Sequence, residues 1–191
     1  MSEDGRRATK VMLIRHAEKP QGSSGDYGVT AEGHRDKESL TVRGWQRAGA
    51  LAHLFAPAEG RAQEQSLARP QFLYASKPKK QNGSRRSMET ITPLAEKLAI
   101  RINCNFMKFD TKELLEEVRV CDGAVLISWQ HDYLPEIANG LLGDETTAPQ
   151  EWPVDRYDVV WVLDLDPASG RYAFKQVPQL LLMGDWATPI R

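Results

Sequence analysis

Residues 11–20, VMLIRHAEKP, run four apolar side chains directly into Arg15 and His16. A continuous apolar run of this length predicts a strand over 11–15 that is buried on both faces, as the strands of parallel sheets are. A cation and a titratable imidazole therefore stand where a buried strand ends. Parallel α/β sheets bind ligands beyond the carboxyl ends of their strands, so we expect this pair to face a site.

Strand and helix patterns alternate along the rest of the chain. Apolar residues at helical spacing predict helices, and short apolar or alternating runs between turn residues predict strands. The predicted elements are, in order, helix 41–56, strand 71–76, helix 85–98, strand 100–106, helix 110–118, strand 123–129, helix 134–143 and a hairpin over 157–177. This order predicts an α/β fold, a three-layer sandwich with a mostly parallel sheet flanked by helices and a C-terminal hairpin at one edge.

Several residues predict where the helices begin and end. Thr41 is expected to cap the first helix, and Asp110 with Glu113 three residues later resembles a capping box. Gly143 is expected to end the last helix. Pro93 interrupts the pattern of its helix and predicts either a kink or a first turn.

Length and composition restrict the class of protein. A chain of 191 residues suits a single domain over 1–191, with residues 1–9 as a flexible tail. The net charge of -1 gives no basic field for nucleic acid, and no apolar run is long enough to cross a membrane. The polar first ten residues lack the apolar core of a signal peptide, and Cys104 and Cys121 are expected to be free thiols. We therefore expect a cytoplasmic protein.

Charged and titratable side chains follow three of the predicted strands. Arg15 and His16 follow the first strand, a basic loop over 77–86 follows the second, and His131 and Asp132 follow the apolar strand at 123–129. Arginine forks bind phosphate oxygens, and a neutral imidazole can attack phosphorus. A second imidazole can stabilise the charge of the transferring group, and a carboxylic acid can protonate the leaving oxygen. The set predicts phosphoryl chemistry.

Four segments together resemble the motifs of the histidine phosphatase superfamily, which has the phosphoglycerate mutase-like fold. The first corresponds to the Arg-His-Gly motif, the second to Leu-Thr-x-x-Gly-x-x-Gln-Ala, the third to Ser…Arg-x-x-x-Thr, and the fourth to the strand and helix around the second histidine. The segments are LIRHAEKP (13–20), LTVRGWQRAGALAHLF (40–55), YAS with RRSMETITPLAEKL (74–76 and 85–98), and GAVLISWQHDYLPEIANGLL (123–142).

The resemblance implies roles for individual residues. His16 corresponds to the nucleophile and Arg15 to a phosphate-binding arginine. The Arg-x-x-x-Thr spacing selects Arg86 with Thr90, and Arg85 is the nearby alternative. His131 corresponds to the second histidine of the pocket.

The chain also departs from the family's motifs. Ala17 replaces the usual glycine, the loop over 77–85 is longer than usual, and SWQH displaces the serine that normally precedes His131. Asp132 matches the proton donor of the acid phosphatase branch, and we find no match to the donor glutamate of the mutase branch. We therefore expect Asp132 to be the general acid, with Glu18 in reserve.

Further candidates for substrate binding lie close to these residues. Trp129 stands two residues before His131, although tryptophans belong more often to a core than to a substrate platform. Arg86 opposes the dipole at the start of its helix, which a bound anion would explain. The basic loop that includes Lys77 either recruits a highly anionic substrate or is a solvated loop, and both interpretations stay open.

The resemblance implies a phosphatase that hydrolyses phosphomonoesters through a phosphohistidine on His16, without metal or cofactor. Its expected partner is a phosphorylated small molecule, with a phosphoprotein as an alternative. For His16 to attack, a backbone carbonyl is expected to hold the proton on its other ring nitrogen. Two other functions stay open, a mutase-like phosphotransferase and a catalytically weak module that binds a phospho-ligand or a protein.

Overall fold

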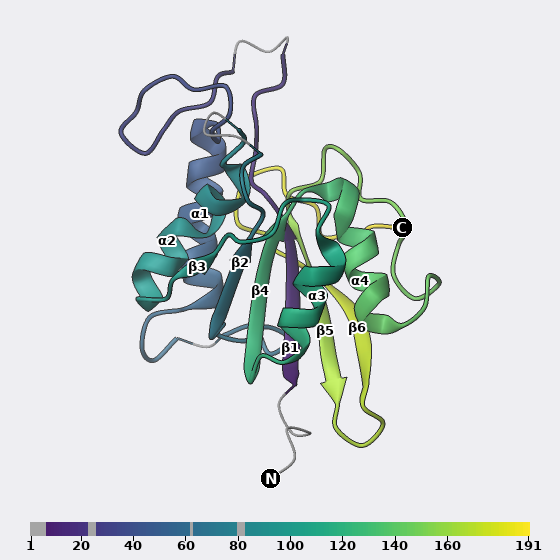
Figure 1. Cartoon of the computed structure of the whole chain (residues 1–191). Coiled ribbons are helices and arrows are strands. Elements are labelled where there is room, and N and C mark those ends of the chain that lie inside the picture. The colour runs from purple at the N-terminus through teal and green to yellow at the C-terminus, as the bar shows by residue number, and fades with distance from the viewer. Residues whose placement is uncertain (1–6, 23–25, 62, 80–82) are drawn as a thin grey trace.

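A computed structural model describes residues 7–22, 26–61, 63–79 and 83–191. Its centre is a six-stranded sheet in the order β3-β2-β4-β1-β5-β6 (Figure 1). The strands are β1 (Ala8–Arg15), β2 (Phe72–Ala75), β3 (Ile102–Asn103), β4 (Gly123–Trp129), β5 (Val159–Asp166) and β6 (Arg171–Pro178). The helices are α1 (Val42–Phe55), α2 (Arg86–Leu98), α3 (Thr111–Arg119), α4 (Leu134–Leu142) and the 3₁₀ helix η1 (His131–Tyr133). In the described part of the chain, no helix has the length and apolar character needed to span a bilayer.

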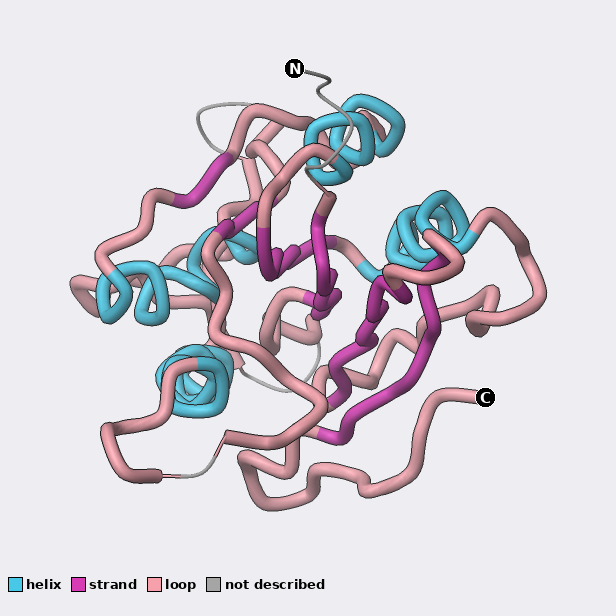
Figure 2. Tube along the Cα trace, turned by 90° about the horizontal axis from the view of Figure 1, so that it is seen from below, coloured by secondary structure: helices cyan, strands magenta, loops and turns pink. Residues whose placement is uncertain are grey.

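The apolar run of β1 is buried on both faces of the sheet. Val11 and Leu13 join a core with α3 and α4, whereas Met12 and Ile14 join a second core with α1 and α2. Successive side chains of a strand point to opposite faces, so an unbroken apolar run supplies both cores. The helices lie on either side of the strands in both views (Figures 1 and 2), which confirms the three predicted layers.

The strand pairing confirms the predicted sheet. β1 runs parallel to β4, and β2 runs parallel to both β3 and β4. β5 is antiparallel to β1 and to β6, so the hairpin of β5 and β6 forms one edge. The carboxyl ends of β1, β2 and β4 therefore meet at one edge of the sheet, the upper edge in Figure 1.

Two strands differ in length from the prediction. β1 begins at Ala8, which is fully buried, so the predicted tail over 1–9 is wrong at its end, and residues 1–6 lie outside the described residues. β3 covers only Ile102 and Asn103 of the predicted 100–106. The Asn103 side-chain oxygen accepts a hydrogen bond from the Asn105 N–H at 3.0 Å, and this local turn competes with further sheet pairing.

Two of the predicted helix ends are confirmed. The Thr41 hydroxyl accepts a hydrogen bond from the Gly44 N–H at 3.1 Å and caps α1. Gly143 follows α4 with a φ of 79°, a left-handed conformation that glycine adopts without strain.

The predicted capping box is wrong, and one of the two interpretations of Pro93 is excluded. The Asp110 carboxylate makes no capping bond to α3 and instead accepts a hydrogen bond from the Met107 N–H at 2.8 Å, in the preceding turn. No capping box with Glu113 therefore forms. Pro93 lies in the middle of α2, which continues past it to Leu98, so it does not mark a first turn.

Gly44 lets the start of α1 approach the segment that follows β1. The Thr41 N–H donates to the Glu18 carbonyl at 3.0 Å, and a Cβ at Gly44 would lie 2.5 Å from that same oxygen. Backbone is the obstacle, so a side chain at Gly44 would displace the segment that carries His16.

We expect Gly44→Ala to lower the free energy of unfolding by about 1–3 kcal/mol, the usual cost of overpacking. The matched control is Gly49→Ala on the same helix, where a Cβ would meet no atom within 4 Å. The control should raise the free energy of unfolding by about 0.5–1 kcal/mol, because alanine forms helices more readily than glycine. Urea unfolding followed by circular dichroism measures both, and equal effects of the two changes would contradict the close approach.

Candidate active site

The ends of β1 and β4 hold the two predicted catalytic histidines next to each other. Arg15 pairs with Trp129 in the parallel register, and the His16 N–H donates to the Trp129 carbonyl at 3.0 Å. His131 begins η1 two residues after Trp129. Each histidine therefore leaves the sheet at the same level of its carboxyl edge.

A cavity of about 440 Å³ lies at this edge. Its lining brings together five of the predicted site residues, His16, Lys77, Arg86, His131 and Asp132. The remaining lining residues are Lys19, Lys79, Ser84, Met107, Lys108, Phe109 and Gln130. Segments that are far apart in the sequence thus meet around the predicted nucleophile.

His16 is held as a neutral imidazole. Its side chain is almost fully buried, and its Nδ1 lies 2.8 Å from the Ala17 carbonyl, an acceptor that requires the proton on Nδ1. Burial, followed by the charges of Arg15 and Arg86, lowers the pKa of His16 to about 3, although the Ala17 carbonyl opposes the shift. Nε2 consequently carries a free lone pair at neutral pH, as a nucleophile requires.

Arg15 is a buried cation that has no carboxylate partner within 4 Å among the residues the structure describes. One Nη donates to the carbonyls of Val154 at 2.6 Å and Arg156 at 3.2 Å, and the other donates to the Tyr157 hydroxyl at 3.1 Å. The guanidinium carbon also lies 3.9 Å from the centre of the Tyr157 ring. Its Nε is buried and has no hydrogen-bond partner among the described residues. Arg15 therefore keeps its full positive charge behind His16.

His131 and Asp132 form a contact at the mouth of the cavity. The His131 Nε2 lies 2.9 Å from an Asp132 carboxylate oxygen, and the Asp132 side chain is 59% exposed. Burial and then the charge of Arg15 lower the pKa of His131, while Asp132 opposes them. An exposed carboxyl group beside the cavity can exchange protons with solvent and with a leaving group.

Thr90 connects the start of α2 to the segment that carries His16. Its hydroxyl accepts a hydrogen bond from the Ala17 N–H at 2.8 Å and donates one to the Arg86 carbonyl at 2.7 Å. The Arg86 side chain donates to the carbonyls of Lys37 and Ser39. The Arg-x-x-x-Thr spacing thus places the arginine in the cavity and lets the threonine fix the residue after His16.

Solved structures of other proteins share the fold of this chain. SixA from Agrobacterium tumefaciens, assigned as a phosphohistidine phosphatase, is 19% identical, with a TM-score of 0.52 over 87% of this chain and 97% of SixA. Bacillus stearothermophilus YhfR is 16% identical, with a TM-score of 0.54 over 87% of this chain and 95% of YhfR. The mycobacterial glucosyl-3-phosphoglycerate phosphatase Rv2419c is 11% identical, with a TM-score of 0.52 over 88% and 97% of the two chains. The chain has the histidine phosphatase fold. No protein-family model and no curated protein sequence matches it.

Four predicted site residues lie outside the cavity lining, and the buried Arg15 described above is one of them. Trp129 is fully buried, and its indole N–H donates to the Lys108 carbonyl at 2.9 Å, so it supports the cavity wall from behind. Arg85 forms an ion pair with Asp36. Glu18, the reserve acid, is bound by arginines of α1 and lines a neighbouring cavity.

Other lining residues were missed from the sequence. Lys19 comes three residues after His16, and the sequence contains no further signal for its role. Lys108 is placed by its carbonyl contact with Trp129, which no pattern indicates. Gln130 donates from its amide nitrogen to the Ser76 hydroxyl at 2.7 Å, and its position in SWQH, where the family has serine, was the available signal.

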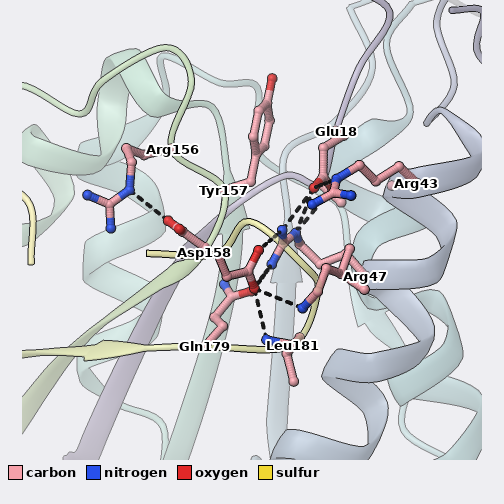
Figure 3. A network of polar contacts seen from close by, with 12 residues as sticks. Glu18, Arg43, Arg47, Arg156, Tyr157, Asp158, Gln179 and Leu181 are labelled. Carbon is pink, nitrogen blue, oxygen red and sulfur yellow. Dashed lines mark hydrogen bonds and ion pairs between the residues drawn. The ribbon is translucent and has the colours of Figure 1, made fainter. Parts of the chain in front are cut away.

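Arg47 joins the nucleophile's segment to α1 and to the C-terminal segment (Figure 3). Its guanidinium contacts Glu18 at 2.9 Å, Asp185 at 2.7 Å and the Gln179 side chain at 2.9 Å. Burial alone would lower the pKa of Arg47, but its hydrogen bonds to Asp185 and Glu18 outweigh burial and raise it. A buried cation between two carboxylates fixes three segments that are distant in the sequence.

We expect Arg47→Met to lower the free energy of unfolding by about 3–5 kcal/mol, because it removes the cation that pairs with the buried Asp185 and leaves Glu18 with the half-exposed Arg43 alone. The control is Arg43→Met, whose half-exposed guanidinium lies 3.3 Å from Glu18. An exposed pair of this kind contributes about 0–1 kcal/mol. Chemical denaturation of both variants measures the difference, and similar losses would show that Arg47 is no more than a surface pair.

The buried His16 also predicts how stability changes with pH. Its pKa is lower in the folded than in the unfolded protein, so its contribution to stability is complete above about pH 6.5 and is lost as the pH falls toward 3. Between pH 6.5 and pH 4 this loss amounts to about 3 kcal/mol. We expect His16→Gln to remove that part of the pH dependence. The His53→Gln variant, which changes an exposed histidine, should keep this pH dependence. The free energy of unfolding of both variants, measured between pH 6.5 and pH 4, tests the prediction.

Proposed function

We propose that this protein hydrolyses phosphomonoesters through a covalent phosphohistidine on His16. The observation that carries the proposal is the state of His16, a buried neutral imidazole whose Nδ1 faces a carbonyl and whose ring lines a cationic cavity. The phosphatases among the fold's solved members support it. The proposed substrate is a phosphorylated small molecule, with a phosphoprotein as the alternative.

In the first step, the His16 Nε2 lone pair forms a bond to phosphorus while the bond from phosphorus to the ester oxygen breaks. Arg86 and His131 hold the phosphate oxygens, and Arg15 stabilises the developing charge from behind the imidazole. Asp132, as the carboxylic acid, donates its proton to the departing oxygen. The products of this step are an alcohol and a phosphohistidine.

In the second step, water attacks the phosphorus atom. The Asp132 carboxylate accepts a proton from that water, the bond between nitrogen and phosphorus breaks, and phosphate leaves. His16 returns to its neutral state and Asp132 to its acid form. Protons and charges therefore balance over the cycle.

The proposed compartment is the cytoplasm. Cys104 and Cys121 are both free thiols, as proteins in a reducing environment keep them.

The first experiment measures phosphate release from p-nitrophenyl phosphate and from an alkyl phosphate, in the presence of EDTA, by wild type and His16→Ala. We expect turnover by the wild type and its loss in the variant. Rapid quenching of the wild type should trap an acid-labile phosphate on His16. Phosphate release that requires a phosphorylated primer would instead indicate a mutase, and tight binding without turnover would indicate a binding module.

Asp132→Asn tests the general acid. We expect its kcat on the alkyl phosphate to fall by about 10²–10⁴, because an alkoxide cannot leave without a proton. On p-nitrophenyl phosphate the loss in the first step should be much smaller, since nitrophenolate leaves unprotonated. Glu18→Gln is the comparison, and a loss that depends on the leaving group in that variant would assign the acid to Glu18 instead.

A further inference from the structure

Four lysines form part of the wall of the catalytic cavity. Lys19 comes from the segment after β1, Lys77 and Lys79 from the loop after β2, and Lys108 from the segment before α3. Within the described ranges, none of them lies within 4 Å of a carboxylate oxygen. The Lys108 ammonium is instead 5.4 Å from the centre of the Tyr133 ring. Three separate segments therefore direct unpaired cations to one place.

Two buried arginines elsewhere in the fold are paired with carboxylates. Arg47 and Arg156 each hold a carboxylate at 2.7 Å, from Asp185 and Asp158 respectively. Among the described residues that line the catalytic cavity, Asp132 is the one carboxylate, and His131 already contacts it. The lysines are thus left without the anions that the chain supplies elsewhere.

The positive charge of Lys19 is disfavoured by its surroundings. Burial, followed by the charges of Arg15 and Arg86, lowers the pKa of Lys19, and Asp132 offsets only part of the effect. Arg86 has the Glu38 carboxylate 3.8 Å away, so the four lysines are the lining cations without a carboxylate partner among the described residues. A phosphomonoester brings about two negative charges at neutral pH. A single phosphate held by Arg86 and His131 therefore offsets only part of the positive charge of the four lysines.

We propose that the substrate carries a second phosphate group, which these four lysines bind beyond the phosphate that His16 attacks. This inference rests on the proposed function and specifies its substrate class. A cavity of about 440 Å³ has the volume of a small-molecule site, which favours a small polyphosphorylated molecule over a phosphoprotein. Lysine suits this role, because its flexible point charge can follow a phosphate whose position varies between substrates.

The test compares glucose 1,6-bisphosphate with glucose 1-phosphate and glucose 6-phosphate, which share one ring. We expect kcat/KM for release of the first phosphate to be at least about tenfold higher for the bisphosphate, as charge-assisted hydrogen bonds to a second phosphate would give. The preference should shrink as salt is raised. In the double variant Lys79→Gln/Lys108→Gln it should fall to less than about threefold. Lys97→Gln removes an exposed lysine at the far end of α2 and should keep the full preference.

Binding separates a failure of this inference from a failure of the proposed function. Titration calorimetry with the His16→Ala protein measures the affinity for the same three sugars without turnover. Tighter binding of the bisphosphate supports a second phosphate site even if no substrate is hydrolysed. Equal affinities together with normal hydrolysis of p-nitrophenyl phosphate would overturn the inference and leave the phosphatase proposal intact. An equally large preference for 2-phosphoglycolate over ethyl phosphate would also overturn it, because a carboxylate would then suffice.

Discussion

The parallel pairing of β1 with β4 is the constraint on which the site depends. It sets Arg15 opposite Trp129 and gives the His16 N–H the Trp129 carbonyl as its acceptor. A shift of one residue would turn the apolar side chains of β1 to the wrong core and His16 away from His131. Alternate residues of β1 pack into the two cores, so the packing of the whole sheet enforces this register. The hydrophobic cores and the chemistry at the sheet edge are therefore fixed together.

The two buried arginines near the site, Arg47 and Arg15, have different kinds of partner. Arg47 lies between two carboxylates and acts as a cross-link among three segments. The two Nη atoms of Arg15 donate to carbonyl oxygens and to a tyrosine hydroxyl, which do not cancel its charge. A carboxylate at that position would raise the pKa of His16 and weaken the attraction for phosphate. Burial, with the uncancelled charge of Arg15 as a smaller contribution, therefore keeps the His16 imidazole neutral.

The sequence was sufficient where a single local pattern determines the structure. The unbroken apolar run of β1 and the alternation of strands and helices predict the layers, and the four motifs place His16, Arg86, His131 and Asp132 at one edge. It was insufficient where long-range contacts decide. No pattern near Lys108 indicates that its carbonyl accepts a hydrogen bond from the Trp129 indole. Arg47 occupies the position where the family's motif has glutamine, and its acidic partners lie far away in the sequence. The capping box at Asp110 failed for the opposite reason, because a competing turn with Met107 lies within the same few residues.

The arginines and the lysines around the cavity differ in burial and in their partners. Arg15 and Arg47 are buried, bound through several N–H groups, and shape the segment that carries His16. Lys19, Lys77 and Lys108 line the open space, where a single ammonium on a flexible stem costs less to leave unpaired than a buried guanidinium would. A cation that only stabilises the fold can pair with a carboxylate of the chain, as Arg156 pairs with Asp158. The unpaired lysines instead face a space large enough for a small molecule. This placement fits the binding of an anion from outside the chain.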